Sequence, residues 1–257
     1  MPNTTVLSEL VHQYSGEVIS RIEALTADAD AGRFDAAIDL MVGAIEGGGV
    51  IQAFGTGHSE AFAMEIAGRA GGLIPTNKIA LRDVVLRGSQ DIAALSGSAL
   101  ERNPSVVDEL FEITPIGPAD VFIIASNSGV NGSIVGLALK AKETGHKLIA
   151  VTSLEHTKQV APKHPSGKRL SEVADVVLDN RAPFGDSTLQ FPGGIPVGAV
   201  SSITAAFIAQ LLTIGTAQRI ADSGGTPPLY ISANIPGGDE HNHKLEALYQ
   251  GKIRRSA

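Results

Sequence analysis

The sequence has no cysteine and no tryptophan, and aromatic residues make up only 4% of its 257 residues. Without thiols, disulfide bonds, thiolate nucleophiles and cysteine-ligated zinc are excluded. The shortage of aromatic rings disfavours a surface on which nucleic-acid bases stack. Basic patches are also lacking, since the formal net charge is −7 and the one basic cluster is Lys252, Arg254 and Arg255. We expect that cluster to be a solvated helix terminus, and we predict no nucleic-acid partner.

Long apolar runs are absent as well. The chain contains no uninterrupted run of about 18 apolar residues, the length that a membrane-spanning helix needs. Residues 1–10 carry neither the basic flank nor the apolar stretch of a signal peptide. The sequence therefore predicts no membrane partner and a cytoplasmic location.

What the chain does have is an alternation of short apolar runs with helical patterns. Hydrophobic residues make up 43% and charged residues 18%, as in globular proteins with a substantial core. Strands are expected at 50–54, 73–76, 121–125, 147–151 and 176–178. Helices are expected at 34–46, 59–70, 104–111, 132–144, 197–221 and 240–254, after a long first helix. This alternation predicts an α/β fold with a parallel sheet.

The simplest domain organisation is a single domain with helical extensions at both ends. We expect N-terminal helices over 1–46, an α/β core over 47–190 and C-terminal helices over 191–257. Residues 77–103 show no regular pattern apart from a possible short helix.

A glycine-rich loop follows the first strand and opens a helix. It reads Gly55-Thr56-Gly57-His58-Ser59, followed by Glu60. Glycines let a backbone approach a ligand closely, and the free N–H groups at a helix start attract anions. A dinucleotide-binding fingerprint would need glycine where Glu60 stands, and a P-loop would need a Gly-Lys-Ser/Thr ending. The loop suits an anion outside those nucleotide modes, although a plain strand-to-helix turn remains the alternative.

A second polar loop follows the third strand and also opens a helix. It contains Ser126, Asn127, Ser128, Gly129 and Asn131, whose short side chains can surround a phosphate together with helix N–H groups. Capping of the helix by Asn131 is the alternative explanation and is compatible with ligand binding.

The two loops gain meaning as a pair. If the strand order is 2-1-3-4-5, the first and third strands are neighbours, and their loops flank the switch point where ligands bind in open α/β sheets. Ser153, just after the fourth strand, is a weaker third contributor.

On these two loops the sequence resembles the sugar isomerase (SIS) domain family. Within that family it is most similar to small bacterial proteins related to N-acetylmuramic acid 6-phosphate etherases and amino-sugar-phosphate dehydratases. Three further segments support the resemblance, namely residues 97–102 (GSALER), 184–187 (FGDS) and 239–242 (DEHN).

The resemblance implies a flavodoxin-like, doubly wound, five-stranded sheet and a homodimer with sites near the subunit interface. It also implies a phosphosugar ligand and neither a metal nor a cofactor. By match to the family motif, Ser59, Ser126, Ser128 and Asn131 would hold the phosphate. Many members carry threonine where this chain has Asn131, which puts one of these contacts in doubt.

Glu101 is the candidate catalytic base. Isomerases and lyases of this kind remove the proton beside the sugar carbonyl, and a β-elimination also needs an acid for the leaving group. Glu101 lies in a stretch of small and polar residues, where the alternative is a surface carboxylate paired with Arg102. His58, inside the first loop, is expected either to open the sugar ring or to bind hydroxyl groups, unless it simply faces solvent.

Other acidic and histidine side chains are weaker candidates. Glu240 and His241 open the C-terminal helix, which in the family often reaches a site and sometimes the partner's. The spacing of His241 and His243 does not favour a metal, because residues i and i+2 point apart on a helix. The remaining candidates are Glu60 and Glu65, on the helix after the first loop, and Asp186, whose alternative role is in a turn.

Three functions therefore remain open. The first is a lyase or dehydratase acting on an N-acetylhexosamine 6-phosphate by proton abstraction at C2. The second is an aldose–ketose isomerase, which shares that first step. The third is a non-catalytic phosphosugar sensor; the absence of a basic recognition helix in the first 45 residues argues against a DNA-bound form of it.

Overall fold

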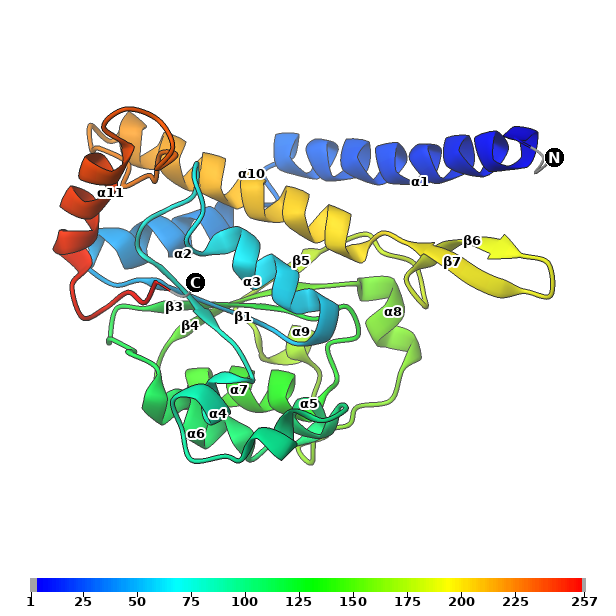
Figure 1. Cartoon of the computed structure of the whole chain (residues 1–257), viewed down its shortest axis with the longest axis horizontal. Helices are drawn as coiled ribbons and strands as arrows, with labels where there is room; N and C mark the ends of the chain where they lie inside the picture. The colour runs from blue at the N-terminus through cyan, green and yellow to red at the C-terminus, as the bar shows by residue number, and fades with distance from the viewer. Residues whose placement is uncertain (1–3, 256–257) are drawn as a thin grey trace.

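The computed structural model describes residues 4–255, with side chains described from residue 8 onward (Figure 1). Residues 1–3, which belong to the segment considered above for a signal peptide, lie outside the described part.

The centre of the molecule is a parallel sheet of five strands in the order β2-β1-β3-β4-β5. The strands are β1 (Ile51–Gly55), β2 (Thr76–Ile79), β3 (Val121–Ala125), β4 (Lys147–Thr152) and β5 (Val176–Asp179). All four neighbouring pairs are parallel, and Gly55 at the end of β1 lies opposite Ala125 at the end of β3. The predicted doubly wound α/β fold and its strand order are confirmed.

Helices cover both faces of the sheet (Figure 1). One face packs against α2 (Asp35–Glu46), α3 (Glu60–Ile66) and α10 (Ser201–Asp222). The other face packs against α4 (Asp83–Leu86), α6 (Val106–Ile113), α7 (Gly132–Glu143) and α9 (Leu170–Val173). Because side chains alternate across a strand, Ala53 belongs to the first cluster and Phe54 to the second, and both are fully buried. This burial on two faces explains why the strands are apolar throughout.

The second strand lies three residues later than the sequence pattern indicated. Leu73 forms an isolated antiparallel bridge with Leu229 instead of joining the sheet, and Thr76 is the first residue paired with β1. Residues 77–103 therefore include most of β2, followed by α4, η2 (Ile92–Leu95) and α5 (Ala99–Arg102). Short elements of about four residues carry too little periodicity to be recognised from the sequence.

The region after β5 also differs from the expected helical extension. An antiparallel hairpin of β6 (Ser187–Phe191) and β7 (Ile195–Ala199) precedes α10, so the helix expected from 197 begins at Ser201. The hairpin turns at Gly193 and Gly194, both with positive φ. The expected 240–254 helix is α11 (Gly238–Glu246), followed by the short η3 (Ala247–Tyr249). The region also contains α8 (Leu154–Gln159), which the pattern did not indicate.

The first helix, α1 (Thr4–Asp30), projects beyond the sheet alongside the hairpin (Figure 1). Tyr14 joins the two, since its hydroxyl donates to the carbonyl oxygen of Ala199 at 2.6 Å. Leu25, near the end of α1, is fully buried, whereas Val11 is 51% exposed. The apolar stripe of this helix is therefore only partly covered within one chain.

Helix α10 is long and apolar enough to pass a length-and-composition test for a membrane span, with a mean hydropathy of 1.2 over 18 residues. Contrary to the sequence-based expectation, the chain therefore contains one such segment. Its Ile208, Ala209 and Leu212 are fully buried in the core against α2 and α3. These contacts are those of a core helix in a globular domain.

Candidate functional site

The loop after β1 is shaped by two glycines. A Cβ on Gly55 would lie 2.2 Å from the carbonyl oxygen of Ser59, so only glycine allows the chain to fold back this tightly. Gly57 has φ +56° and begins a short 3₁₀ turn, η1 (Gly57–Ser59), which leads into α3. Neither Thr56 nor Ser59 caps the following helical turn with its side chain. Within residues 4–255 these two hydroxyls have no hydrogen-bond partner and remain available to a ligand.

The loop after β3 is more firmly held. The Ser126 hydroxyl is buried and accepts a hydrogen bond from the Gly129 N–H at 3.1 Å, and Gly129 has φ +65°. Ser128 is half-buried, and its hydroxyl has no partner in the described part of the chain. Helix α7 then begins at Gly132 without a side-chain cap from Asn131, so the N–H groups of its first turn are unsatisfied within the helix.

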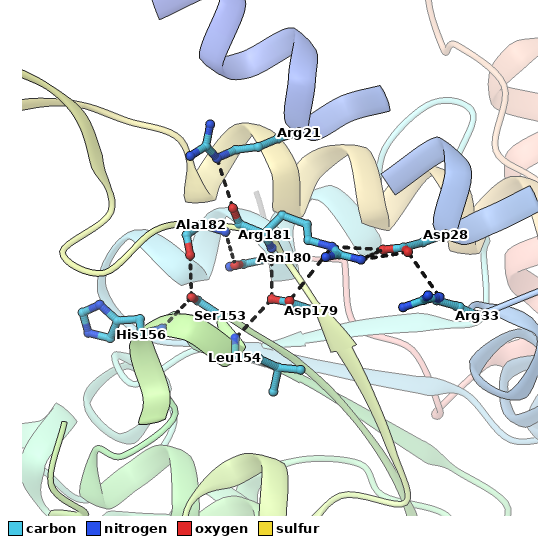
Figure 2. A network of polar contacts seen from close by, with 10 residues as sticks. All are labelled: Arg21, Asp28, Arg33, Ser153, Leu154, His156, Asp179, Asn180, Arg181 and Ala182. Atoms are coloured by element: carbon cyan, nitrogen blue, oxygen red, sulfur yellow. Dashed lines mark hydrogen bonds and ion pairs between the residues drawn. The ribbon is translucent and has the colours of Figure 1, made fainter. Parts of the chain in front are cut away.

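Asn180 fixes the orientation of Asn127 in this loop. The Asn180 amide NH₂ donates to Asn127 Oδ1 at 3.1 Å, and its own Oδ1 accepts from the Ala182 N–H. Because Asn127 Oδ1 is an acceptor in this contact, its NH₂ group remains as the donor. Figure 2 shows Asn180 beside Ala182 in the segment that follows β5.

Glu101 lies between the two loops. Its carboxylate accepts from the Asn131 side-chain amide, and its carbonyl oxygen accepts from the Ser133 hydroxyl at 2.8 Å. A Cβ built on Gly57 would be 3.8 Å from Glu101 Oε2. The structure thus brings together three positions that are far apart in sequence. Among the described residues Glu101 forms no ion pair with Arg102, which was the alternative explanation for this carboxylate.

The close approach of Glu101 depends on a backbone contact. Helix α5, which carries Glu101, packs on the start of α7, where a Cβ on Gly132 would meet the Arg102 carbonyl oxygen at 2.2 Å. Any side chain at Gly132 would push the two helices apart. Asn131 Oδ1 is buried without a partner in this contact.

Two hollows flank the η1 turn. The larger has a volume of about 610 Å³, open to solvent, and Glu101, Glu60 and Arg82 line it beside the backbone of Gly55 to Gly57. The smaller, about 270 Å³, lies between η1 and the amino end of α10. Polar residues of four separate segments line the smaller hollow: His58, Ser59, Ser126, Asn127, Asn180, Ser201 and Ser202. Hydroxyl and amide donors on one side and carboxylates on the other can hold an anionic ester and act on the carbon skeleton attached to it.

Comparison with known proteins places this arrangement in a family. Residues 13–153 match the family model described as the SIS domain, which is more than half of the chain. The chain belongs to the SIS-domain family. It is 34% identical to the UPF0309 protein GK1441 of Geobacillus kaustophilus (strain HTA426), over 95% of this chain and 96% of that one. It is 39% identical to the UPF0309 protein lmo0025 of Listeria monocytogenes, over 84% and 88% of the two chains.

Solved structures resemble this SIS domain in fold. E. coli CFT073 c3406, in complex with a sugar phosphate, has a TM-score of 0.54 and 17% identity, covering 85% of this chain and 94% of that one. The phosphoheptose isomerase GmhA from Neisseria gonorrhoeae has a TM-score of 0.50 and 20% identity, covering 84% and 99%. At these identities the likeness concerns the fold alone.

Glu60 of the SIS domain is paired rather than free. It accepts two hydrogen bonds from Arg82, at 2.6 and 3.0 Å, and its carboxylate lies 3.6 Å from Lys78 Nζ. Glu65 is turned elsewhere on α3, where it pairs with Arg69 and accepts from Gln210. Of these two carboxylates, only Glu60 borders the larger hollow.

Ser153 is not directed at either hollow. Its hydroxyl donates to the Ala182 carbonyl oxygen at 2.6 Å and accepts from the His156 N–H at 2.9 Å, so it caps α8. The side chain is fully buried, and both contacts are visible in Figure 2. This serine holds two segments of the protein together.

Glu240 and His241 lie away from the two loops of their own chain. His241 Nε2 is 3.0 Å from the Leu229 carbonyl oxygen, and Leu229 bridges to Leu73 just before β2 begins. Helix α11 therefore sits beside the amino end of the edge strand, whereas the loops lie at the carboxyl ends of the strands. Among residues whose side chains are described, no group of three or more potential metal ligands comes together.

Asp186 caps the helix that borders the smaller hollow. Its carboxylate accepts from the Ser201 N–H and hydroxyl, at 2.8 and 2.7 Å, and from the Val200 N–H. Nearby, the pKa of His156 is lowered, chiefly because burial disfavours the charged ring; Asp186 opposes this shift and Lys163 adds to it. His156 Nδ1 accepts from the Gly185 N–H at 2.9 Å, which requires the neutral ring.

The structure adds residues that sequence reasoning did not single out. Asn180 follows β5 as the two polar loops follow β1 and β3, so its place at a strand end was a usable signal. Ser201 and Ser202 were assigned to a helix interior because the hairpin before α10 was not foreseen. Arg82 lay in the unpatterned stretch and gave no signal.

Proposed function

We propose that this protein is an enzyme that binds an amino-sugar 6-phosphate and removes the proton at C2 with Glu101. The observation that carries the proposal is the position of the Glu101 carboxylate between the Gly57 turn and Asn131 at the start of α7. A sugar whose phosphate is bound by the two loops would present its carbon skeleton to this carboxylate.

The phosphate would be held by neutral donors. Helix α7 is 12 residues long, and the N–H groups of its first turn carry the positive end of the helix dipole. Ser59, Ser126, Ser128 and Asn131 are proposed to add hydroxyl and amide donors around the same oxygens. Asn127 would contribute the NH₂ group that Asn180 leaves unused.

The comparisons support a sugar phosphate without identifying it. The E. coli protein of similar fold is in complex with a sugar phosphate, and the Neisseria protein is a phosphoheptose isomerase. The amino-sugar 6-phosphate proposed here rests on the resemblance of residues 97–102 and 239–242 to etherases and dehydratases of such compounds.

The proposed chemistry begins with transfer of the C2 proton of the open-chain sugar to Glu101. For a lyase, the electron pair then expels the oxygen substituent at C3, which takes a proton from an acid as it leaves. His58 is the proposed acid, or the group that opens the ring, since it lines the smaller hollow beside Ser59. An isomerase would share the first step and return the proton to C1.

Proton NMR in deuterated water tests this reaction. The protein is incubated with the 6-phosphates of glucosamine, N-acetylglucosamine and N-acetylmuramic acid, and the C2 proton is followed. We expect exchange or loss at C2 for at least one compound, with a new C2–C3 alkene for a lyase and a ketose for an isomerase. Binding of all three detected by thermal stabilisation, with no change at C2, would replace the enzyme with a phosphosugar sensor.

Glu101→Gln separates catalysis from binding in the same assay. Removal of a general base lowers turnover by about 10²–10⁴-fold, while the amide keeps the size of the side chain and should bind the sugar phosphate within about threefold. Glu112→Gln, at an exposed position on α6, is the matched control and should have no effect. Unchanged turnover in Glu101→Gln would reject the assignment of the base.

We also propose a cytoplasmic homodimer in which the whole chain folds as one SIS domain. The apolar side chains left exposed on α1 and the hairpin would be covered by a second copy: Val11, Ile19, Phe191, Ile195 and Val197. In such a dimer, Glu240 and His241 would act, if at all, in the partner's site. Sedimentation velocity should give twice the chain mass, and a monomer at micromolar concentration would contradict the proposal.

A further inference from the structure

The basic cluster near the end of the chain is not a solvated helix terminus, as the sequence suggested. After η3 the chain returns to the edge strand β2, where Asn77 holds it with two hydrogen bonds. The Asn77 side chain donates to the Lys252 carbonyl oxygen and accepts from the Arg254 N–H, both at 2.7 Å. Asn77 is buried, so this segment is fixed in place.

This return places cationic side chains around a hollow beside β2. The hollow has a volume of about 780 Å³, and its lining includes Lys78, Arg254, Arg255 and the ring of Tyr230. It lies along the edge of the sheet, next to the residues that follow α3, and shares no lining residue with the hollows beside the η1 turn. In a protein with a net charge of −7, such a concentration of positive charge is a distinct local feature.

The cations are only partly neutralised by the protein. Arg255 pairs with Glu246 at 2.9 Å and lies over the Tyr230 ring, 5.6 Å from its centre. Lys78 pairs with Glu60 at 3.6 Å. Arg254 has no ion-pair partner within residues 4–255.

The surroundings of Arg254 favour an added anion. Burial and the nearby Arg87 guanidinium both lower the pKa of Arg254, so its charge is poorly compensated. Asp83 offsets this only in part. An anion entering the hollow would supply the missing countercharge.

We propose that this hollow is a second ligand site, which binds a small anion bearing phosphate groups through Arg254 and Lys78. A guanidinium offers two parallel N–H donors that match the oxygens of a phosphate, and the ammonium adds a compact charge. The Tyr230 ring, held by a hydrogen bond from its hydroxyl to Glu246 at 3.0 Å, forms a rigid wall. This site does not depend on the serine loops.

Lys78 connects this site to the proposed sugar site. Its ammonium group reaches Glu60, which also holds Arg82 on the wall of the larger hollow. An anion that draws Lys78 away would leave Glu60 with Arg82 alone. Occupancy of the second site therefore changes the charge balance beside Glu101.

Isothermal titration calorimetry with inorganic pyrophosphate tests the proposal on the full chain. We expect Arg254→Gln to bind at least tenfold more weakly, since its backbone N–H still holds Asn77 and the fold is kept. Lys252→Gln is the matched control: it removes one charge from the same segment, but the Lys252 side chain donates to the Gly48 carbonyl oxygen and lines another hollow. Its affinity should stay within twofold of the wild type.

Two further variants distinguish this site from the serine loops. Ser128→Ala should leave pyrophosphate binding at this hollow unchanged, whereas loss of all binding in that variant would overturn the second site. Glu60→Gln frees Lys78 and should tighten binding about threefold. Equal weakening in Arg254→Gln and Lys252→Gln would also overturn the proposal, because it would indicate non-specific attraction. Melting temperatures verify that each variant is folded.

Discussion

The loops after β1 and β4 both place a serine at a strand end, but they use it in opposite ways. The Ser59 hydroxyl has no partner in the part of the chain that the structure describes, and it borders the smaller hollow. The Ser153 hydroxyl is fully buried and is engaged by Ala182 and His156. A serine at the carboxyl end of a strand therefore indicates a ligand only where its hydrogen-bonding capacity is left over.

The loop after β3 lies between these two cases. Ser126 is used internally by the Gly129 N–H, and Asn127 is oriented by Asn180, while Ser128 remains unused. Contacts within the protein thus fix the shape of this loop before any ligand arrives. Such preorganisation lowers the entropy that binding must lose, and it makes this loop the more rigid half of the proposed phosphate site.

The strongest way to break the comparison is Gly55→Ala. A methyl group at Gly55 would meet the Ser59 backbone oxygen at 2.2 Å, and relief requires movement of the main chain. We expect a loss of about 3 kcal/mol or more in the free energy of unfolding, measured by denaturant titration. Gly57→Ala is the control in the same loop. It has room, with Glu101 Oε2 at 3.8 Å, and should lose only about 1 kcal/mol for its positive φ. Equal losses would show that the turn is not constrained as described.

The sheet and the two loops were predictable because their signals are local. Fully buried strands such as Val121–Ala125 are continuous apolar runs, and a glycine or serine directly after each marks where it ends. The edge strand β2 was misplaced because Leu73 to Pro75 look as apolar as a strand, although Leu73 pairs with Leu229 across the chain. No local pattern reports such a distant partner.

The next effect in size is expected for Ser153→Ala. The change removes the partner of a buried carbonyl oxygen and of a buried N–H, and it should lower the free energy of unfolding by about 1–3 kcal/mol. For a chain of this length that is a fall in melting temperature of roughly 2–4 °C per kcal/mol. Sugar-phosphate affinity should be retained, and a selective loss of affinity with normal stability would return Ser153 to the phosphate site.

Ser59→Ala should show the reverse behaviour. Its hydroxyl contributes nothing to the fold that a partner reveals, so the free energy of unfolding should change by less than about 0.5 kcal/mol. Loss of one hydrogen bond to a charged phosphate should weaken binding of the sugar phosphate about tenfold, as titration calorimetry would measure. A destabilised Ser59→Ala with unchanged affinity would remove the distinction between the two serines.

Sequence reasoning selected Glu101 from composition alone, because nothing in residues 77–103 predicts where that stretch folds. Its place beside Asn131 depends on Gly132, which lets α5 touch α7. The role of Asn180 could not be read from the sequence either, since its contact with Asn127 joins residues 53 positions apart. Geometry of this kind follows from the packing of the whole sheet.

The smallest expected effect concerns the pH dependence of the Ser153 loop. Burial lowers the pKa of His156, whose Nδ1 must stay unprotonated to accept from the Gly185 N–H. The unfolded chain takes up this proton near pH 6.5, whereas the folded chain resists until a lower pH. The contribution of His156 is therefore complete above about pH 6.5 and is lost as the pH falls through the folded pKa. His156→Gln should reduce the fall in melting temperature between pH 7 and pH 5 by about 1 °C. If the variant and the wild type follow the same curve, His156 does not help to hold the Ser153 loop, and the contrast with Ser59 rests on the hydroxyl contacts alone.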